Sequence, residues 1–310
     1  MKYFLVIVLL LASTIDATAR EQRYRPARLH DGRPDLQGVW AATNLTPFTR
    51  PKNIEALIIT PEQARQIERQ RLAEEEDRTT PTEPTEYFDT RRIERVDGEL
   101  RSSIIIDPPN GQLPGNAQLA EAFRRFRIGM AAPIGPESRA PSERCLPAPT
   151  AQPPLMPWPS NSLVQIVQTA GIVAIHAEAI HDARIIRINA KHAPAAMTSW
   201  LGDSIGWWDG DAFVVQTKHF HPDYPVRSAP GYRFLISSQA VVTERFTRLS
   251  KDELLYEFTV DDPIYYTQTW RGESHFLRTT DPIFEYACHE GNYSLPSMLE
   301  AARQLDAPAR

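Results

Sequence analysis

Residues 253–260 read ELLYEFTV, and polar and apolar side chains alternate along this stretch. In an extended strand, successive side chains point to opposite faces of the sheet. One face therefore carries Leu254, Tyr256, Phe258 and Val260, and the other carries Glu253, Leu255, Glu257 and Thr259. This period of two predicts a strand whose apolar face is turned toward a protein core.

Similar segments, rich in Val, Ile, Tyr, Phe and Thr, lie on both sides of this strand. They are Leu163–Gln168, Ile172–Ala177, Arg184–Asn189, Ser204–Trp208, Ala212–Thr217, Val241–Leu249, Glu253–Val260, Tyr265–Arg271 and Phe284–Cys288. The sequences DGD at 209–211 and SKD at 250–252 are typical of the turns between neighbouring strands. Short strands joined by tight turns, without helices between them, predict a mainly β fold: an antiparallel meander that closes into a lipocalin-like barrel or a sandwich.

The region before these strands is expected to be partly helical. Thr60 can cap a helix, Pro61 suits its first position, and Gln63 completes a capping box. This helix should run to about Glu76. A second helix is expected over Asn116–Arg127, where apolar residues recur at helical spacing.

The first residues have the order of an export signal. Lys2 precedes an apolar run over Tyr3–Ala12, and the sequence ATA at 17–19 is a cleavage site. The run is about half of the roughly 20 residues that a membrane span needs. We therefore expect a periplasmic or secreted protein with no membrane span after signal cleavage. The expected division is a signal peptide at 1–19, an extended and helical region at 20–131, a proline-rich connector at 132–160 and the β-barrel at 161–310.

Charge and missing motifs exclude several classes of function. The net charge of −5 and the lack of a basic cluster with interleaved aromatic residues argue against nucleic acid as a partner. The sequence contains no glycine-rich nucleotide loop, no serine nucleophile elbow and no HExxH zinc helix. We expect no cofactor.

The chain has two cysteines, Cys145 and Cys288, and both follow the export signal. Neither belongs to a CxxC redox motif or a haem-attachment motif. In an oxidising compartment, such a pair predicts one disulfide.

Four short blocks stand out along the chain: DGRPDLQGVW at 31–40, WWDGD at 207–211, TERF at 243–246 and YACHEGNY at 286–293. They resemble the signature blocks of a large set of uncharacterised secreted bacterial proteins. The resemblance implies a shared fold and no particular reaction. The meander is also similar to lipocalin-type barrels, which include carriers and cofactor-free enzymes, and this second likeness concerns the fold alone.

Four residues are candidates for proton transfer in such a barrel. His289, held beside the predicted disulfide, has Glu290 next to it, and an ordered His–carboxylate arrangement suits general acid–base catalysis. Glu244 could exchange protons if its face of the strand turns inward. Tyr256 would be the acid, and Arg245 would stabilise developing negative charge. The alternative for His289 and Glu290 is a structural role at the end of the last strand.

Candidate substrate-binding residues are aromatic or charged. They are Trp208, Tyr266, Trp270, Glu178, Arg184 and Glu290. Rings of this kind are more often core residues, although they also suit an aromatic ligand. Glu178 and Arg184 are equally explained as a partly buried ion pair.

His219 and His221 alternate on an extended segment and could share a metal ion. No third ligand follows at a compact spacing, so we expect no metal site.

These observations predict an exported, cofactor-independent enzyme of the lyase, isomerase or cyclase type. It would act by proton transfer on a hydrophobic, aromatic small molecule. The alternative is a non-catalytic periplasmic carrier of a hydrophobic ligand. A structural module of the cell envelope is a third possibility, favoured if side chains fill the barrel.

Overall fold

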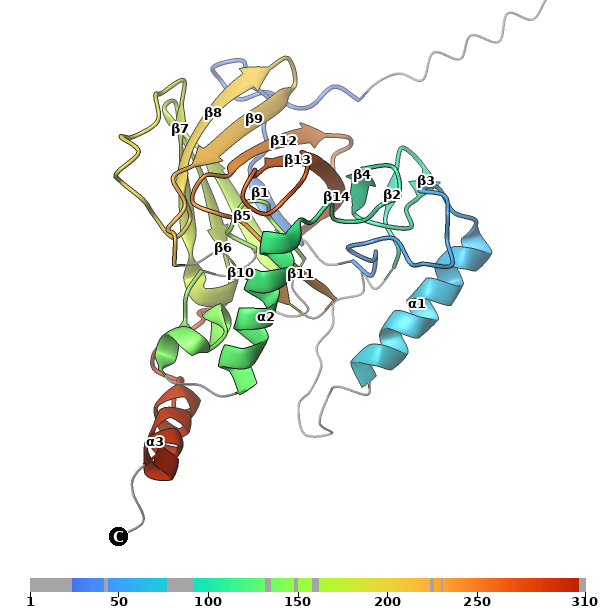
Figure 1. Cartoon of the computed structure of the whole chain (residues 1–310). Helices are drawn as coiled ribbons and strands as arrows, with labels where there is room; N and C mark the ends of the chain where they lie inside the picture. Colours follow the sequence, from blue (N-terminus) through green and yellow to red (C-terminus); the bar gives the residue numbers. More distant parts are fainter. Residues whose placement is uncertain are drawn as a thin grey trace, which may run out of the picture.

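The computed structural model describes residues 24–41, 44–76, 92–131, 135–147, 150–157, 162–223, 226–229 and 231–306. The predicted signal peptide at 1–19 and parts of the proline-rich connector lie outside the described residues. A β-barrel forms the body of the molecule, and helices lie at its lower end and side (Figure 1).

The main sheet contains ten strands in the order β1-β5-β6-β7-β8-β9-β12-β13-β14-β4. Their bounds are β1 Gly38–Ala41, β4 Ile105–Asp107, β5 Leu163–Gln168, β6 Ile172–Ala177, β7 Ala183–Ile188, β8 Asp203–Asp209, β9 Ala212–Lys218, β12 Val241–Arg248, β13 Glu253–Asp261 and β14 Trp270–Thr279. Because β1 pairs with both β5 and β14, nine strands close into a barrel and β4 lies outside it. This confirms the predicted lipocalin-like barrel. One pair, β7 with β8, is parallel, so the barrel is mixed rather than purely antiparallel.

The remaining elements are short hairpins and helices. They are β2 Arg95–Val96, β3 Glu99–Leu100, β10 Val226–Ala229, β11 Tyr232–Leu235, α1 Pro61–Glu76, α2 Ala117–Ala131, α3 Ser294–Asp306, and the 3-10 turns η1 Pro136–Ser138, η2 Pro141–Arg144 and η3 Ala179–His181. The predicted capping box of α1 is present, because the Thr60 amide donates to Gln63 Oε1 (2.9 Å) and the Gln63 amide donates to Thr60 Oγ1 (3.3 Å). Within the described part of the chain, no helix has the length and apolarity needed to cross a bilayer.

Two of the predicted strands need correction. Tyr265–Arg271 is mostly a turn, and β14 begins at Trp270. Tyr266 is instead tied to β11, where its hydroxyl donates to the Leu235 carbonyl (2.7 Å). Phe284–Cys288 forms no strand. The end of β14 that leads toward this segment, Leu277–Thr279, already pairs with β1, so it offers no free edge to a further strand.

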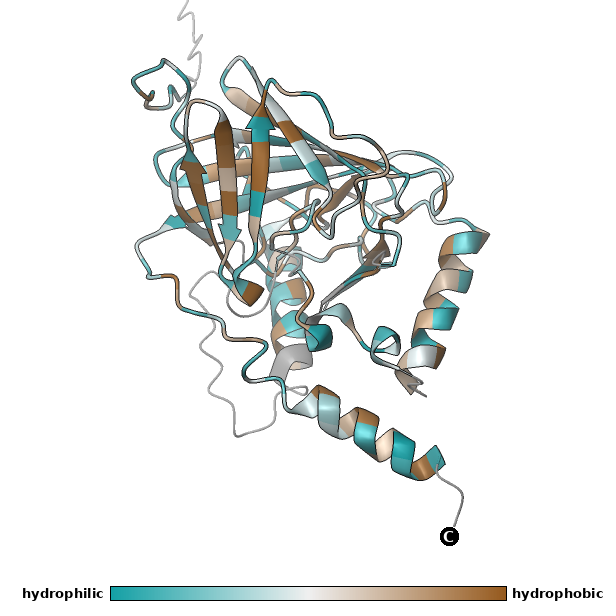
Figure 2. Ribbon diagram, turned by 90° about the vertical axis from the view of Figure 1, so that its left-hand side faces the viewer, coloured by the Kyte–Doolittle hydropathy of each residue, from teal (hydrophilic) through white to brown (hydrophobic). Residues whose placement is uncertain are grey.

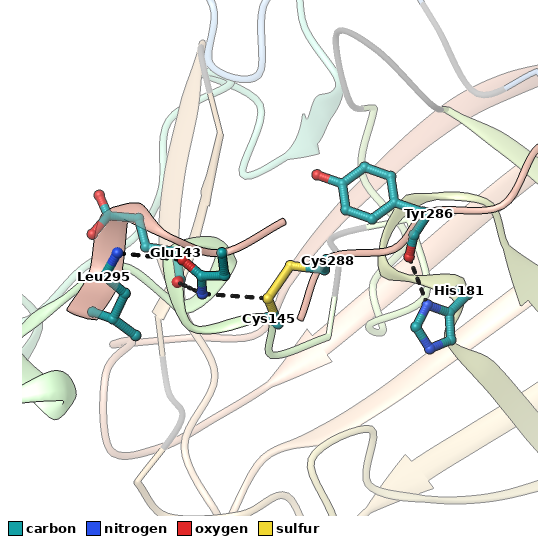
Figure 3. Close-up of a disulfide and its surroundings, with 7 residues drawn as sticks. Glu143, Cys145, His181, Tyr286, Cys288 and Leu295 are labelled. Carbon is teal, nitrogen blue, oxygen red and sulfur yellow. Dashed lines mark hydrogen bonds between the residues drawn. A yellow bond between two sulfur atoms is a disulfide. The ribbon is translucent and has the colours of Figure 1, made fainter. Parts of the chain in front are cut away.

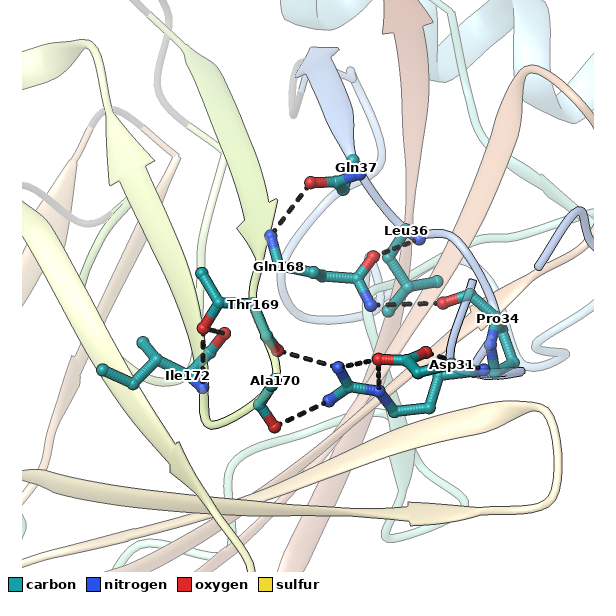
Figure 4. A network of polar contacts seen from close by, with 9 residues as sticks. Asp31, Pro34, Leu36, Gln37, Gln168, Thr169, Ala170 and Ile172 are labelled. Atoms are coloured by element: carbon teal, nitrogen blue, oxygen red, sulfur yellow. Dashed lines mark hydrogen bonds and ion pairs between the residues drawn. The ribbon is translucent and has the colours of Figure 1, made fainter. Parts of the chain in front are cut away.

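The strand that closes the barrel, β1, belongs to the DGRPDLQGVW block and was not predicted. Arg33 holds this block against the β5–β6 turn by donating to the carbonyls of Thr169 (2.8 Å) and Ala170 (3.3 Å). The side chain of Gln168 accepts from the Leu36 amide (2.6 Å) and donates to the Pro34 carbonyl (3.2 Å) (Figure 4). The block therefore positions β1 for closure.

The inward-facing side chains of β13 are those predicted from alternation. Leu254, Tyr256, Phe258 and Val260 are all buried. The Tyr256 ring stacks on Phe276 with centroids 5.3 Å apart and lies 5.7 Å from Phe258. A Cβ atom on Gly272 would lie 2.3 Å from the Phe258 ring, so only glycine leaves room for this ring. Aromatic side chains therefore fill this part of the barrel.

Part of the proline-rich connector also fills the barrel. Residues 150–156 are all buried, and Ala151, Leu155 and Met156 pack in the same core as the inward-facing residues of the strands. The Leu155 amide donates to the Tyr256 hydroxyl (2.7 Å). The connector is therefore a structural part of the barrel core.

Candidate functional site

An ionic network lies inside the barrel and joins side chains of β7, β12 and β13. Arg184 on β7 donates from Nη1 to Glu244 Oε2 (2.8 Å) and from Nη2 to Glu244 Oε1 (3.1 Å). Such two-point contacts are among the stronger hydrogen bonds in proteins. Tyr256 on β13 donates its hydroxyl proton to Glu244 Oε1 (2.8 Å). The structure thus brings together three residues that the sequence singled out.

The network is sealed from solvent. Glu244 and Tyr256 have 0% exposed surface, and the Arg184 side chain has 1%. A hollow wide enough for water would leave accessible surface on its walls. Burial, and secondly the negative charge of Glu244, hold the pKa of Tyr256 well above its usual range, so this phenol keeps its proton. The arrangement neutralises buried charges and leaves no space for a substrate beside them.

Arg245 lies on the opposite face of β12 from Glu244. Its guanidinium forms an ion pair with Asp209 (2.7 Å), and its side chain is 39% exposed. Neighbouring residues of a strand point to opposite faces. The structure therefore does not bring Arg245 to Glu244, contrary to the expectation that both act at one site.

His289 and Glu290 are exposed residues of a turn that follows the disulfide, outside the barrel. The predicted Cys145–Cys288 disulfide is present (Figure 3). Asn292 donates to the Glu143 carbonyl (2.7 Å), which further ties this turn to the connector. The block YACHEGNY therefore anchors the C-terminal segment, and its histidine is separated from Glu244 and Tyr256.

A shallow hollow of about 400 Å³ lies beside this disulfide. Its lining includes Glu143, Glu285, Tyr286, Cys288 and Asn292. His289 and Glu290 do not line it. It therefore lacks the pair that was expected to carry acid–base chemistry.

Glu178 and Arg184 do not form the ion pair that the sequence suggested. Arg184 pairs with Glu244, whereas buried Glu178 accepts a hydrogen bond from the Phe284 amide (3.1 Å). Both residues are buried, but each has a different partner. Glu178 holds the C-terminal segment against the end of β6.

The aromatic candidates belong to the core, which was the alternative interpretation. Trp270 has 0% exposed surface, and Tyr266 is buried and hydrogen bonded to β11. Trp208 is partly exposed and packs against Phe213, with ring centroids 5.1 Å apart. None of the three lines either of the two clefts described in this subsection.

His219 and His221 diverge instead of facing a common metal ion. His219 lies against His192 (centroids 5.7 Å apart), and His221 stacks on Trp200 (4.0 Å). Among the described residues, no group of three His, Cys, Asp or Glu side chains could hold a metal.

A His–Asp pair that the sequence did not reveal lies next to His219. His192 Nδ1 contacts Asp203 Oδ2 (2.7 Å), and Asp203 also accepts from the Ala193 amide (2.9 Å) and from Arg187 (2.6 Å). Burial alone would raise the pKa of Asp203, but these hydrogen bonds and the charge of Arg187 together lower it. Asp203 therefore stays charged and anchors the loop after β7.

A second buried carboxylate lies at the edge of β14, where that strand changes partner from β1 to β4. Glu94 Oε1 accepts from the Ser274 hydroxyl (2.6 Å), the His275 amide (2.9 Å) and Asn44 Nδ2 (2.6 Å). Glu94 thus accepts the hydrogen bond of the His275 amide, which has no partner strand at this edge of β14. Burial raises the pKa of Glu94 to about 7, although the hydrogen bonds from Ser274 and His275 act in the opposite direction.

A cleft of about 220 Å³ lies between residues 47–54, helix α1 and the β10–β11 turn. Its lining includes apolar side chains of Phe48, Ile54 and Ile67 and polar side chains of Gln66, Gln70 and Arg71. The Phe48 ring stacks on Phe234 (5.3 Å between centroids) and meets Trp270 edge-on (5.9 Å). The cleft therefore borders the aromatic core of the barrel.

Comparisons with known proteins assign no family to this chain. No protein-family model, no curated protein and no solved structure matches it. The resemblance of the four sequence blocks to secreted bacterial proteins therefore stays a prediction, and the function has to be inferred from the residues of the chain itself.

Proposed function

We propose that the protein is a non-catalytic carrier that binds a small aromatic molecule in the cleft between α1 and the β10–β11 turn. One observation carries this proposal: the cleft borders the Phe48–Phe234 stack, whereas the candidate catalytic groups inside the barrel expose no surface. Ligand sites are typically concave, with apolar walls and a few polar groups that orient the ligand. The cleft combines apolar residues with about as many polar ones.

The size and charge of the cleft limit the ligand. Sites for drug-sized molecules span roughly 300–1,000 Å³, and this cleft of about 220 Å³ suits a smaller, one-ring molecule. Phe48 and Ile67 would contact the ring. Gln66, Gln70 and Arg71 make the other side of the cleft polar, which favours a ligand that carries a polar substituent on its ring.

We also propose that the protein works in the periplasm or outside the cell. The export signal expected at 1–19 supports this location. The disulfide supports it as well, because such bonds persist mainly in oxidising compartments.

The proton-transfer enzyme expected from the sequence is the second candidate, favoured by the hydrogen bond between Tyr256 and Glu244. A substrate could reach these groups only after a rearrangement of the segments that bury them, residues 150–156 among them, because neither group has exposed surface. The carrier needs no such rearrangement and is therefore our first proposal.

Thermal unfolding with and without small ligands tests the carrier proposal. We would use benzoate, 4-hydroxybenzoate and benzyl alcohol as probes. A ligand present at about 100 times its Kd adds about 2.7 kcal/mol to the free energy of unfolding and raises Tm. We expect such a rise for at least one of these probes.

A blocking variant locates the binding site. Gln66→Trp should fill the cleft and abolish the rise in Tm, whereas Arg69→Trp adds the same ring on the outward side of α1 and should preserve it. A rise that survives Gln66→Trp, or a probe that is converted into product, would contradict the carrier proposal. The absence of a rise with every one-ring aromatic probe would also count against it.

A further inference from the structure

A second hydrophobic core lies beside the barrel core. It consists of buried side chains from residues 45–59, helix α1 and the β2–β3 region: Leu45, Ile54, Ile59, Ala64, Ile67, Ile93 and Leu100. Helix α1 and the β2–β3 hairpin lie at the same side of the barrel (Figure 1), and hydrophobic and hydrophilic residues alternate along α1, at the upper right of Figure 2. Ile54 and Ile67 also line the cleft between α1 and the β10–β11 turn. The cleft walls, residues 47–54 and α1, therefore belong partly to this second core.

Hydrogen bonds connect the segment around Glu94 to both cleft walls. The Glu94 amide donates to Thr46 Oγ1 (2.9 Å), and Thr46 directly precedes the wall at 47–54. The Ile93 amide donates to Glu68 Oε1 of α1 (2.9 Å). A displacement of this segment would therefore act on both walls of the cleft.

The side chain of Glu94 fixes the same segment to the barrel. Its Oε1 atom accepts from the Ser274 hydroxyl and from the His275 amide of β14. The Arg101 amide donates to the Glu94 carbonyl (3.1 Å), and the Arg101 guanidinium pairs with Glu273, which is also on β14. The segment before β2 thus lies between the cleft walls and the barrel, and Glu94 contacts both.

The surroundings of Glu94 do not compensate a negative charge. Its Oε2 atom has no hydrogen-bond partner among the described residues. The charge of Glu273 disfavours ionisation of Glu94, and Arg101, which favours it, already pairs with Glu273. Burial lowers the pKa of His275, so its imidazole supplies no positive charge at neutral pH, and Glu68 on the α1 side is itself a carboxylate. Ionisation of Glu94 therefore leaves a buried charge without a partner, which is costly.

We propose that protonated Glu94 is a positioning residue for the cleft, and that loss of its proton loosens both cleft walls and weakens ligand binding. The inference rests on the proposed carrier function, because it concerns the ligand site of that proposal. Burial raises the pKa of Glu94 to about 7, so the protonated form, and with it the closed cleft, predominates below this pH. The affinity for ligand should therefore be highest below pH 7 and fall as the pH rises through about 7.

Amide hydrogen exchange of the ligand-free protein tests the movement of the walls. Protection factors, which correct for the intrinsic pH dependence of exchange, are compared at pH 5 and pH 8 over residues 45–54 and 62–71. In the wild type we expect protection to fall by between about tenfold and a hundredfold, because opening of the segment returns the pKa of Glu94 from about 7 toward 4.5. Glu94→Gln keeps the hydrogen-bond acceptor and cannot ionise, so its protection should be equal at both pH values.

Glu99→Gln is the matched control, because Glu99 lies exposed on β3 of the same hairpin. This variant should keep the wild-type fall in protection. Equal protection of the wild type at both pH values would overturn the proposal, and so would a fall that persists in Glu94→Gln. A fall confined to residues 92–105 would also overturn it, because the charge would then act on the segment itself and not on the cleft walls.

Ligand titrations at the same two pH values test the effect on binding. Benzyl alcohol, which is uncharged at both, and benzoate, which is an anion at both, are the probes. In the wild type the apparent Kd should rise at least about threefold from pH 5 to pH 8, because only the closed fraction binds, and it should stay constant in Glu94→Gln. A constant Kd in the wild type would overturn the proposal. If neither probe binds at either pH while protection falls as expected, the carrier function is refuted and Glu94 remains the residue that positions the walls.

Discussion

Glu94 shows how one buried carboxylate completes a strand edge. It accepts three hydrogen bonds at Oε1, while Oε2 has no hydrogen-bond partner among the described residues. The nearby charge of Glu273 and the burial of the site both disfavour the ionised form. The protonated form is therefore the more stable one in the folded protein below about pH 7.

Glu94 should make the stability of the protein depend on pH. Its pKa rises from 4.5 to about 7 on folding, so the protonated carboxyl stabilises the fold fully below pH 4.5 and progressively less as the pH rises to 7. The loss amounts to about 3 kcal/mol, at about 1.4 kcal/mol for each pKa unit. Glu94→Gln imitates the protonated form and should remove this decline. Urea unfolding of both proteins at pH 5 and pH 8 measures this decline in the free energy of unfolding. If Glu94→Gln shows the same difference between the two pH values as the wild type, Glu94 is not its cause.

Arg184 and Glu244 show why a buried charge pair is not by itself evidence of catalysis. Removing one partner of such a pair usually costs about 3–5 kcal/mol, because the other charge stays buried without compensation. The Tyr256 hydroxyl satisfies a further lone pair of Glu244. The residues that suggested proton transfer are therefore equally explained as a buried network in which the opposite charges of Arg184 and Glu244 compensate each other.

At the scale of elements, the proline-rich connector contributes side chains to the barrel core, as the strands do. Prolines prevent regular structure over residues 150–156, yet this segment is buried in the barrel and the Leu155 amide reaches Tyr256. The barrel has nine closed strands, and an interior of about this size is either filled by side chains or holds one small ligand. The connector fills the space that a ligand occupies in a hollow barrel.

Leu155→Ala should leave a dry cavity inside the barrel. Truncating a buried leucine costs about 2–5 kcal/mol, and apolar cavities of this kind bind benzene-sized molecules. We expect a lower Tm that benzene partly restores. Leu305→Ala is the matched control, because Leu305 is 86% exposed and its truncation should change Tm little. If benzene leaves the Tm of Leu155→Ala unchanged, residues 150–156 have filled the space of the removed side chain. The variant then has no cavity that could bind a ligand.

At the scale of the whole molecule, the Cys145–Cys288 disulfide links the connector to the segment that follows β14. The two cysteines are 143 residues apart in sequence, and the intervening loop contains most of the barrel. Long loops lose the most entropy when a disulfide closes them in the unfolded chain. The disulfide therefore acts on the stability of the whole barrel.

Replacing both cysteines by serine should destabilise the protein strongly. The chain-entropy relation gives about 5 kcal/mol for a loop of this length. Denaturant unfolding of Cys145→Ser/Cys288→Ser, compared with the wild type in the absence of reductant, measures the difference. A change below about 1 kcal/mol would mean that the C-terminal segment alone depends on the bond. Wild type treated with reductant should match the double variant.

Local patterns in the sequence determined several features correctly. The Thr60–Gln63 capping box, the inward face of β13 and the β-rich second half depend on backbone geometry that neighbouring residues set. The disulfide followed from having two cysteines in a chain that is expected to be exported. The capping box, the strand face and the β-rich half require no knowledge of a distant part of the chain, and the disulfide required only that the chain has two cysteines.

The tertiary structure alone decided which distant residues meet. β1 closes the barrel and thereby denies Phe284–Cys288 an edge, residues 150–156 occupy the interior, and Arg184 pairs with Glu244 rather than with Glu178. Alternation tells which side chains share a face, but it does not tell which strand arrives next to them or what fills the space they enclose. For this reason alternation placed Tyr256 on the inward face and left the direction of Glu244 open, and only the folded barrel revealed that Tyr256 contacts both Glu244 and the connector.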